Sequence, residues 1–275
     1  MKPASFDYVR CETADEALAL LKQHGDEACI MAGGQSLMPM LNMRLVRPTI
    51  VVDIGAIAAL SYCRVEGEAV EIGATFTQGA LEAWPEVGRR LPLLAAALPE
   101  IGHFQTRNRG TVCGSLCHAD PSSELPLCLA TLGGEVVVRS ARRRRTLKAA
   151  DFQRGLLTTA REPDEMVIAV RYPAARPGFG YAFREIARRH GDFAIVALAA
   201  ICNGATVRLG VGGVADRPVV REWANLDAGG LADALNEFAW DLGGSDDIHA
   251  TARYRREMVR RLGKKVIEEA RRCAS

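Results

Sequence analysis

The sequence predicts an α+β protein of two domains, and three observations lead to this expectation. The chain has 275 residues, whereas one domain typically holds about 150. The segment YPAARPG at residues 172–178 is the clearest linker, because it is rich in proline and glycine. After it, strand patterns joined by an Asn203-Gly204 turn precede two helical patterns, as in an antiparallel sheet followed by helices. We therefore expect a first domain at residues 1–176 and a second at residues 177–275.

The start of the chain predicts a small subdomain that ends near residue 55. A capping box begins a helix at residues 13–24. The apolar run at 28–32 predicts a strand that enters a Gly-Gly turn, and Ser36 then caps a short helix. The β-branched run at 49–54 predicts a further strand.

The rest of the chain divides into a second subdomain and the C-terminal domain. Residues 106–123 are rich in Gly, Asn, Ser, Asp and Pro, which predicts a long irregular segment of the functional kind. The other expected elements are a hairpin at 62–73, helices at 91–100, 124–132, 231–240 and 248–273, and strands at 135–139, 166–171, 181–187, 195–202 and 205–211.

Charge and hydropathy exclude several classes of protein. Lysine and arginine total 35 against 33 acidic residues, which disfavours a general nucleic-acid binder. The four arginines at 142–145 have no aromatic residues among them, so we expect a solvated loop tip there. Since no apolar run reaches the length of about 18 residues that a membrane span needs, and no apolar leader is visible, we expect a cytoplasmic protein.

The eight cysteines do not suggest a metal centre. No C-x-x-C pair occurs, and Cys113 and Cys117 are the nearest pair. We expect free thiols in a reducing compartment, and no zinc or iron–sulfur site on this chain.

Two glycine-containing loops are the candidate binding site. In the first, Gly33-Gly34 follows a strand and precedes a helix, which suits an anion but also an ordinary tight turn. The second, at 110–115, again offers small residues and hydroxyls, and Asp120 and Glu124 follow it. Carboxylates accept hydrogen bonds from sugar or polyol hydroxyls. The residues alone therefore favour a dinucleotide held between two subdomains, with tight turns as the open alternative.

These loops also carry a resemblance to a family. AGGQSLMPMLNMRLVRP at 32–48 and QTRNRGTVCGSLCHADPSSELP at 105–126 resemble the FAD-binding subunit of the molybdenum hydroxylases, relatives of xanthine dehydrogenase and carbon-monoxide dehydrogenase. PDEMVIAVRYP at 163–173 and RRHGDFAIV at 188–196 extend the similarity over nearly the whole chain. The resemblance implies an FAD domain of the p-cresol methylhydroxylase/vanillyl-alcohol oxidase type in two subdomains, followed by a domain of antiparallel sheet and helices.

The resemblance also implies a set of cofactor-binding residues. The first loop would wrap the FAD pyrophosphate from one side and the second loop from the other, while other residues would reach the ribityl chain and the flavin ring. The first loop contributes Ala32, Gly33, Gly34, Gln35, Ser36 and Leu37, and the second contributes Thr111, Gly114 and Ser115. Ile101 and Gly102 would lie near the flavin, Glu124 with Asp120 near the ribityl hydroxyls, and Arg184 and Phe193 near the isoalloxazine.

Two positions depart from the family pattern. Cys113 stands where relatives usually have glycine, and it would be strained only if the backbone there had a positive φ. Arg161 replaces a usual leucine, which would weaken an apolar contact to the cofactor.

The function implied by the resemblance is electron transfer. Non-covalent FAD would take electrons from [2Fe–2S] clusters on a small partner subunit, and substrate would be hydroxylated at molybdopterin on a large partner subunit, in a dimer of heterotrimers. The flavin would then pass the electrons to an external acceptor, so no catalytic acid or base is needed here. Two alternatives stay open: a self-contained flavin oxidoreductase with its own small substrate, and an assembly subunit with a degenerate cofactor site.

Overall fold

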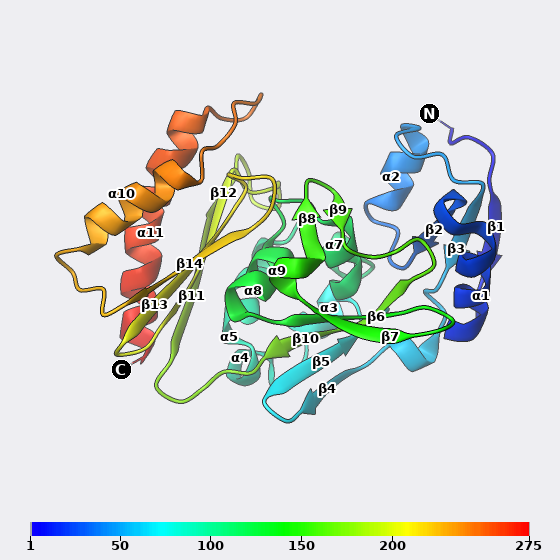
Figure 1. Cartoon of the computed structure of the whole chain (residues 1–275), viewed down its shortest axis with the longest axis horizontal. Coiled ribbons are helices and arrows are strands. Elements are labelled where there is room, and N and C mark those ends of the chain that lie inside the picture. Colours follow the sequence, from blue (N-terminus) through cyan, green and yellow to red (C-terminus); the bar gives the residue numbers. More distant parts are fainter. Residues whose placement is uncertain (1, 275) are drawn as a thin grey trace.

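The structure is a computed structural model, and it describes residues 2–274. Its three larger sheets follow one another along the long axis of the molecule in the order of the chain (Figure 1). A three-stranded parallel sheet lies at the N-terminal end, a five-stranded sheet in the middle, and a four-stranded sheet at the C-terminal end. This arrangement confirms the predicted α+β class, with a sheet domain at the C-terminus.

The parallel sheet forms the first subdomain. Its strands are, in spatial order, β1 (Asp7–Arg10), β3 (Ile50–Asp53) and β2 (Ala28–Met31). Helix α1 (Ala14–His24) connects β1 to β2 and buries Leu18 and Leu21. The predicted capping box of Thr13 and Glu16 is present, because Glu16 N donates to Thr13 Oγ1. The sequence did not predict β1, whose four side chains are all exposed.

The five-stranded sheet is antiparallel and carries the second subdomain. Its spatial order is β4 (Cys63–Glu66), β5 (Ala69–Gly73), β10 (Met166–Pro173), β6 (Glu135–Arg139) and β7 (Arg144–Lys148). The predicted hairpin of β4 and β5 is confirmed. The solvated loop tip expected at the four arginines is wrong in part, since Arg144 and Arg145 begin β7. Arg145 is ordered there because its Nη2 lies 2.6 Å from Oε2 of the fully buried Glu165.

The helices of the chain before the linker correct another expectation. Helix α2 (Leu37–Asn42) lies between β2 and β3 of the first subdomain, and the second subdomain has α3 (Gln78–Glu82), α4 (Val87–Arg90), α5 (Pro92–Ala97), α6 (Phe104–Arg107), α7 (Val112–His118), α8 (Glu124–Leu132) and α9 (Ala149–Phe152). The segment predicted to be irregular therefore contains α7 and part of α6. Thr111 caps α7 by accepting a hydrogen bond of 3.0 Å from Gly114 N at Oγ1. This N-cap overrides the low helix propensity of the glycine and serine in that helix.

Short elements complete the chain up to the linker. They are the 3-10 helices η1 (Gly25–Glu27), η2 (Ala58–Leu60) and η3 (Leu98–Glu100), and the two-stranded β8 (Gln153–Gly155) and β9 (Thr158–Thr159).

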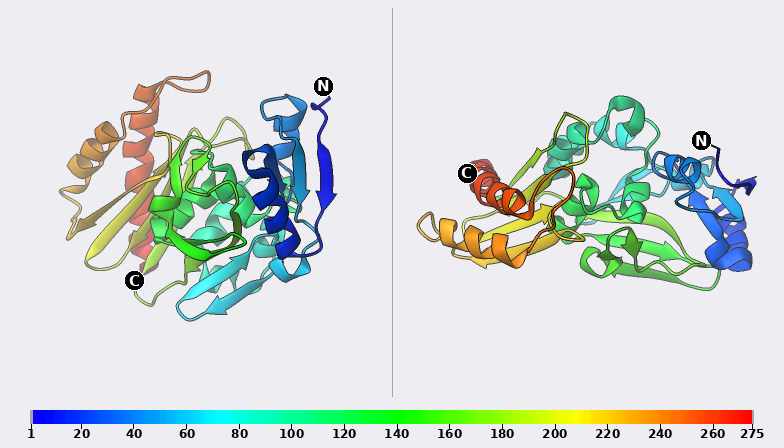
Figure 2. Two further views of the ribbon diagram at one scale, coloured as in Figure 1. Left: turned by 45° about the vertical axis from the view of Figure 1, so that its right-hand side comes forward. Right: turned by 90° about the horizontal axis from the view of Figure 1, so that it is seen from above.

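The C-terminal sheet is antiparallel, as predicted, and its strands follow one another in chain order. Its strands are β11 (Gly180–Ile186), β12 (Val196–Cys202), β13 (Thr206–Gly212) and β14 (Val219–Ala224), of which β14 was not expected. At the predicted hairpin, Asn203 Oδ1 accepts from Thr206 N at 2.7 Å. Helices α10 (Leu231–Asp241) and α11 (Ala252–Ala274) cover one face, and α5 and α8 pack on the other (Figure 2).

The continuous apolar run of β12 follows from this packing. Ala197 and Ala199 join the core shared with α8, while Leu198 and Ala200 join the core beneath α11. Because both faces of β12 are buried, its sequence is apolar throughout and does not alternate between apolar and polar residues. Along residues 2–274, no helix is both long enough and apolar enough to cross a membrane.

Candidate functional site

A cavity of about 500 Å³ lies where the first loop, α7 and the start of the C-terminal domain meet. This volume is within the range of about 300–1,000 Å³ that is usual for small-molecule and cofactor sites. Its walls come from segments far apart in the chain, including β2, α7 and residues 191–193. The sequence predicted most of these segments as parts of one site, and the fold brings them together.

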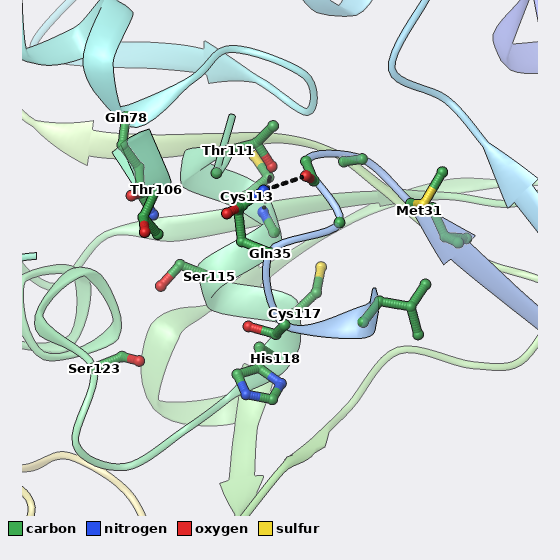
Figure 3. Close-up of a pocket in the computed structure, with 18 of the residues that line it drawn as sticks. Met31, Gln35, Gln78, Thr106, Thr111, Cys113, Ser115, Cys117, His118 and Ser123 are labelled. Carbon is green, nitrogen blue, oxygen red and sulfur yellow. Dashed lines mark hydrogen bonds between the residues drawn. The ribbon is translucent and has the colours of Figure 1, made fainter. Parts of the chain in front are cut away.

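The first predicted loop forms one wall. All six of its candidate residues line the cavity: Ala32, Gly33, Gly34, Gln35, Ser36 and Leu37. Gln35 Nε2 donates to the Gly33 carbonyl oxygen at 3.2 Å, which holds the loop in shape (Figure 3). Ser36 occupies the N-cap position of α2 but makes no side-chain cap bond. Its hydroxyl is therefore available to a ligand.

The second predicted loop and α7 form the facing wall. Thr111, Gly114 and Ser115 line the cavity, together with Ile101 and Gly102. Figure 3 shows Thr111, Ser115, Cys117 and His118 following one another along α7. Successive turns of one short helix thus place hydroxyls near its start and a thiol and an imidazole near its end.

Gly33 fixes how closely the two loops approach each other. A Cβ at this position would lie 2.8 Å from the Arg109 carbonyl carbon and 2.9 Å from Gly110 Cα, and closer still to the Arg109 carbonyl oxygen. We expected this Gly-Gly turn to suit an anion. The structure shows that the absence of a side chain at Gly33 makes room for the backbone of the opposite loop, which brings both loops onto the same cavity.

The C-terminal domain closes one end of the cavity. Gly191, Asp192 and Phe193 line it, and the Phe193 residue is 61% exposed. Gly191 has φ +84°, and a Cβ there would lie 2.9 Å from the Gly102 carbonyl oxygen. Residues of both domains therefore meet at this end, where an aromatic ring also stands at the surface.

Two predicted residues are not brought to the cavity. Arg184 pairs with Glu269 of α11, with Nη2 2.7 Å from Oε2. Asp120 accepts a hydrogen bond from Ser122 N at 2.8 Å and stabilises the turn before α8. Neither residue is among those that line the cavity.

Glu124 is the buried carboxyl group of the cavity wall. It is 5% exposed, and burial raises its pKa to about 7, although its own backbone N–H opposes the shift. The charges of Asp120 and Glu100 raise this pKa further. A carboxyl group in this state can both donate and accept hydrogen bonds near neutral pH, which suits polyol hydroxyls.

A second carboxyl, missed in the sequence, lies on β11 and has one buried oxygen. Burial raises the pKa of Glu185 to about 8, and the charges of Glu124 and Glu100 contribute. Its Oε2 has no hydrogen-bond partner among the described residues. Nothing in the sequence marked Glu185, because only the packing of β11 against the first domain buries it.

The two departures from the family pattern are both compatible with the site. Cys113 lies within α7, so its φ is negative and the cysteine is unstrained. Its Sγ contacts the Ile72 carbonyl oxygen at 3.6 Å. Arg161 lines the cavity, and its Nη1 donates to the carbonyl oxygens of Glu162 and Glu165.

The residues present fit a flavin nucleotide. The cavity combines glycine loops and hydroxyls with apolar and sulfur-containing side chains, which suits a ligand with phosphates and flat rings. Gln78 also lines it, and its Oε1 is buried without a partner among the described residues. A buried amide oxygen of this kind costs free energy until a bound group donates to it. Sequence reasoning missed Gln78, since a single glutamine carries no pattern.

Comparison with known proteins decides the family. Residues 4–175 match the model of the FAD binding domain in molybdopterin dehydrogenase. The chain belongs to this family. Residues 181–270 match a second model, the CO dehydrogenase flavoprotein C-terminal domain. Both loops, and all cavity-lining residues from Ala28 to Val167, fall within the first match.

Individual members of the family are similar over most of the chain. The chain is 35% identical over 283 residues to the 6-hydroxypseudooxynicotine dehydrogenase complex subunit alpha of Paenarthrobacter nicotinovorans, covering 98% of this chain and 96% of that one. It is 40% identical over 195 residues to caffeine dehydrogenase subunit beta of Pseudomonas sp. (strain CBB1), covering 70% and 66%. A chain of reconstituted CO dehydrogenase from Oligotropha carboxidovorans superposes with a TM-score of 0.94 at 31% identity, covering 99% and 100%.

Proposed function

We propose that this chain is the FAD-binding electron-transfer subunit of a multi-subunit molybdenum hydroxylase. The observation that carries the proposal is the cavity formed jointly by the two glycine loops, within the part of the chain that matches the FAD domain family. Bound FAD would supply the redox chemistry, accepting electrons from one centre and delivering them to another.

The residues of this chain would bind and orient the cofactor. Gly33 brings the backbones of the two loops together, Gly34 and Gly114 line the cavity, and Ser36 and Ser115 would offer hydroxyls to the pyrophosphate. Glu124 would hold the ribityl hydroxyls from the buried side of the cavity. Two of the expected residues would act indirectly. Asp120 stabilises the turn before α8, and Arg184 stabilises the contact between β11 and α11.

The electrons would come from partner chains. We propose a small [2Fe–2S] subunit as the donor to this flavin and a large molybdopterin subunit as the site of substrate hydroxylation, assembled as a dimer of heterotrimers. The relatives named as subunits of dehydrogenases support a complex of several chains. We also propose that the complex is cytoplasmic. We propose that the boundary between the two domains of this chain lies between residues 176 and 177.

The test compares the chain alone with the assembled complex. The chain alone should bind about one FAD, have no hydroxylase activity on candidate substrates, and show flavin bleaching with an artificial reductant. Hydroxylation coupled to flavin reduction should appear only when the two partner chains are added. Steady-state turnover by the lone chain would instead support a self-contained flavoenzyme, and a chain that binds no flavin would support an assembly role.

A further inference from the structure

Helix α11 concentrates positive charge on the outer side of the C-terminal domain. It carries nine basic and three acidic residues, whereas the whole chain has 35 basic and 33 acidic residues, so the remainder of the chain is acidic overall. Its apolar side chains, such as Val259, Val266 and Ile267, are fully buried beside the C-terminal sheet, which leaves most of the charged side chains facing outward. Helices α10 and α11 lie together at the end of the molecule opposite the parallel sheet (Figures 1 and 2).

Three exposed cations of α11 have no acidic partner. Arg253, Lys264 and Lys265 are exposed, and none of them forms an ion pair with another described residue. Elsewhere on the same helix a neighbouring carboxylate offsets the charge, as where Glu257 Oε1 lies 2.6 Å from Arg261 Nε. Cations without such partners produce a positive potential that an acidic protein surface would complement.

An exposed tryptophan lies beside these cations. Trp240, near the end of α10, is 57% exposed, and the Arg256 guanidinium lies 4.5 Å from its ring centroid. Arg256 Nη1 also donates to the Gly243 carbonyl oxygen at 2.5 Å, which fixes the guanidinium over the ring. Tyr254 is exposed on the first turn of α11. Tryptophan, tyrosine and arginine are the residue types enriched among the hot spots of protein interfaces.

The loop between α10 and α11 presents an isoleucine in a fixed position. Ile248 is 91% exposed. The adjacent Asp247 accepts a hydrogen bond from Ala250 N at 2.9 Å and pairs with Arg255 Nη2 at 2.5 Å. Arg255 is buried, and its Nη1 donates to the Ile195 carbonyl oxygen at 2.6 Å. Because the loop is already ordered, docking on it would cost little conformational entropy.

Three kinds of occupant fit this surface poorly. A second copy docked about a twofold axis would place two basic helices face to face, and like charges repel. A bilayer would require the apolar side of α11, which packs on β11 and β12. Single-stranded nucleic acid would need free aromatic faces, whereas Arg256 covers one face of Trp240. An acidic protein surface that also receives apolar side chains fits better.

We propose that the outer face of α10 and α11 docks an acidic surface of the large molybdopterin subunit. The proposal rests on the proposed function, which supplies that partner. An electron-donating chain must reach the cavity, but no described residue of α10 or α11 lines the cavity. The four-stranded sheet lies between these helices and α8 (Figure 2). The face therefore suits the partner that does not deliver electrons to the flavin. We call this surface the α10–α11 face; it comprises Trp240, Ile248, Arg253, Tyr254, Arg256, Lys264 and Lys265.

The test measures binding of the full flavin-loaded chain to each purified partner subunit separately, by biolayer interferometry. Trp240→Ala should weaken binding of the large subunit by about 10- to 30-fold, as expected for an interface hot spot. Lys264→Glu combined with Lys265→Glu should weaken it by about 10-fold at low salt, and by less at about 0.5 M salt, because salt screens the lost attraction. Lys22→Glu combined with Arg142→Glu is the matched control, since it changes the net charge equally at exposed positions of the first domain. The control should bind the large subunit normally.

Flavin content and thermal unfolding of each variant report whether it is folded, and both should match the unmodified chain. Ile248→Asp offers a second test at a side chain whose loss should not affect folding, and it too should weaken binding of the large subunit. Unchanged binding of the large subunit by all three variants would overturn the proposal. Loss of binding to the small subunit alone would assign the face to the electron donor, and loss of binding to anionic vesicles or RNA with normal subunit binding would assign it to those ligands. An unmodified chain that binds flavin but neither subunit would refute the assembly in the proposed function, and the docking proposal with it.

Discussion

Gly33→Ala should reduce FAD binding by pushing the two glycine loops apart. The added Cβ would lie 2.8 Å from the Arg109 carbonyl carbon, whereas ordinary contacts are 3.4–4 Å. The loops must therefore separate by about 0.6 Å or more, because both sides of the contact are backbone. The φ of Gly33 is not in the positive range, so alanine adds no strain besides this overlap.

The expected cost is that of overpacking a close contact, about 1–3 kcal/mol. If this cost reduces the free energy of FAD binding, the FAD dissociation constant rises by about 5- to 150-fold. Fluorescence titration of the flavin-free chain measures the constant, and flavin absorbance per purified chain measures occupancy. Thermal unfolding of the same samples shows how much of the cost falls on folding.

Gly88→Ala is the matched control. Gly88 lies in α4, and a Cβ there would meet nothing within 4 Å. This variant should bind FAD normally and unfold at the same or a slightly higher temperature, because alanine is the better helix former. Wild-type FAD affinity in Gly33→Ala would refute the conclusion that the contact between the loops shapes the site.

Three further outcomes are expected. Acid precipitation should release the flavin into the supernatant, since the cavity is proposed to hold FAD without a covalent bond, and a yellow pellet would contradict this. Arg145→Ala should destabilise the chain by about 3 kcal/mol in thermal unfolding, because it weakens the pairing of the fully buried Glu165, whereas Arg144→Ala at an exposed position should stay within about 0.5 kcal/mol. Burial raises the pKa of Glu124 from 4.5 to about 7, so the folded chain binds the extra proton and loses stability as pH rises through that window. Glu124→Gln in the flavin-free chain should remove up to about 3 kcal/mol of this loss, and parallel stability–pH curves for the two chains would count against it.

Local patterns in the sequence were sufficient for most secondary structure. The Thr13 cap, the Asn203-Gly204 hairpin and the β12 run each depend on neighbouring residues, so their structures could be read without the fold. The failures include β1, β7, α7 and β14. β1 has no buried side chain to mark it, and α7 is stabilised by one threonine cap despite its glycine and serine.

The candidate site divides in the same way. Both glycine loops were recognised from residue types and spacing, and both line the cavity. Glu185 and Gln78 could not be found, because their burial arises from the packing of segments distant in the chain. Arg184 was expected at the site but pairs with Glu269, a partner 85 residues away that no local pattern indicates.

The sequence by itself determined the α+β class and the two loops, because glycines, caps and apolar periods act over a few residues, and its loop motifs carried the resemblance to the family. Only the tertiary structure decided what each group does there. It showed that Gly33 serves the contact between loops and that Arg145 neutralises a buried carboxylate. These roles depend on distances between residues far apart in the chain, which are set by the packing of the sheets and helices.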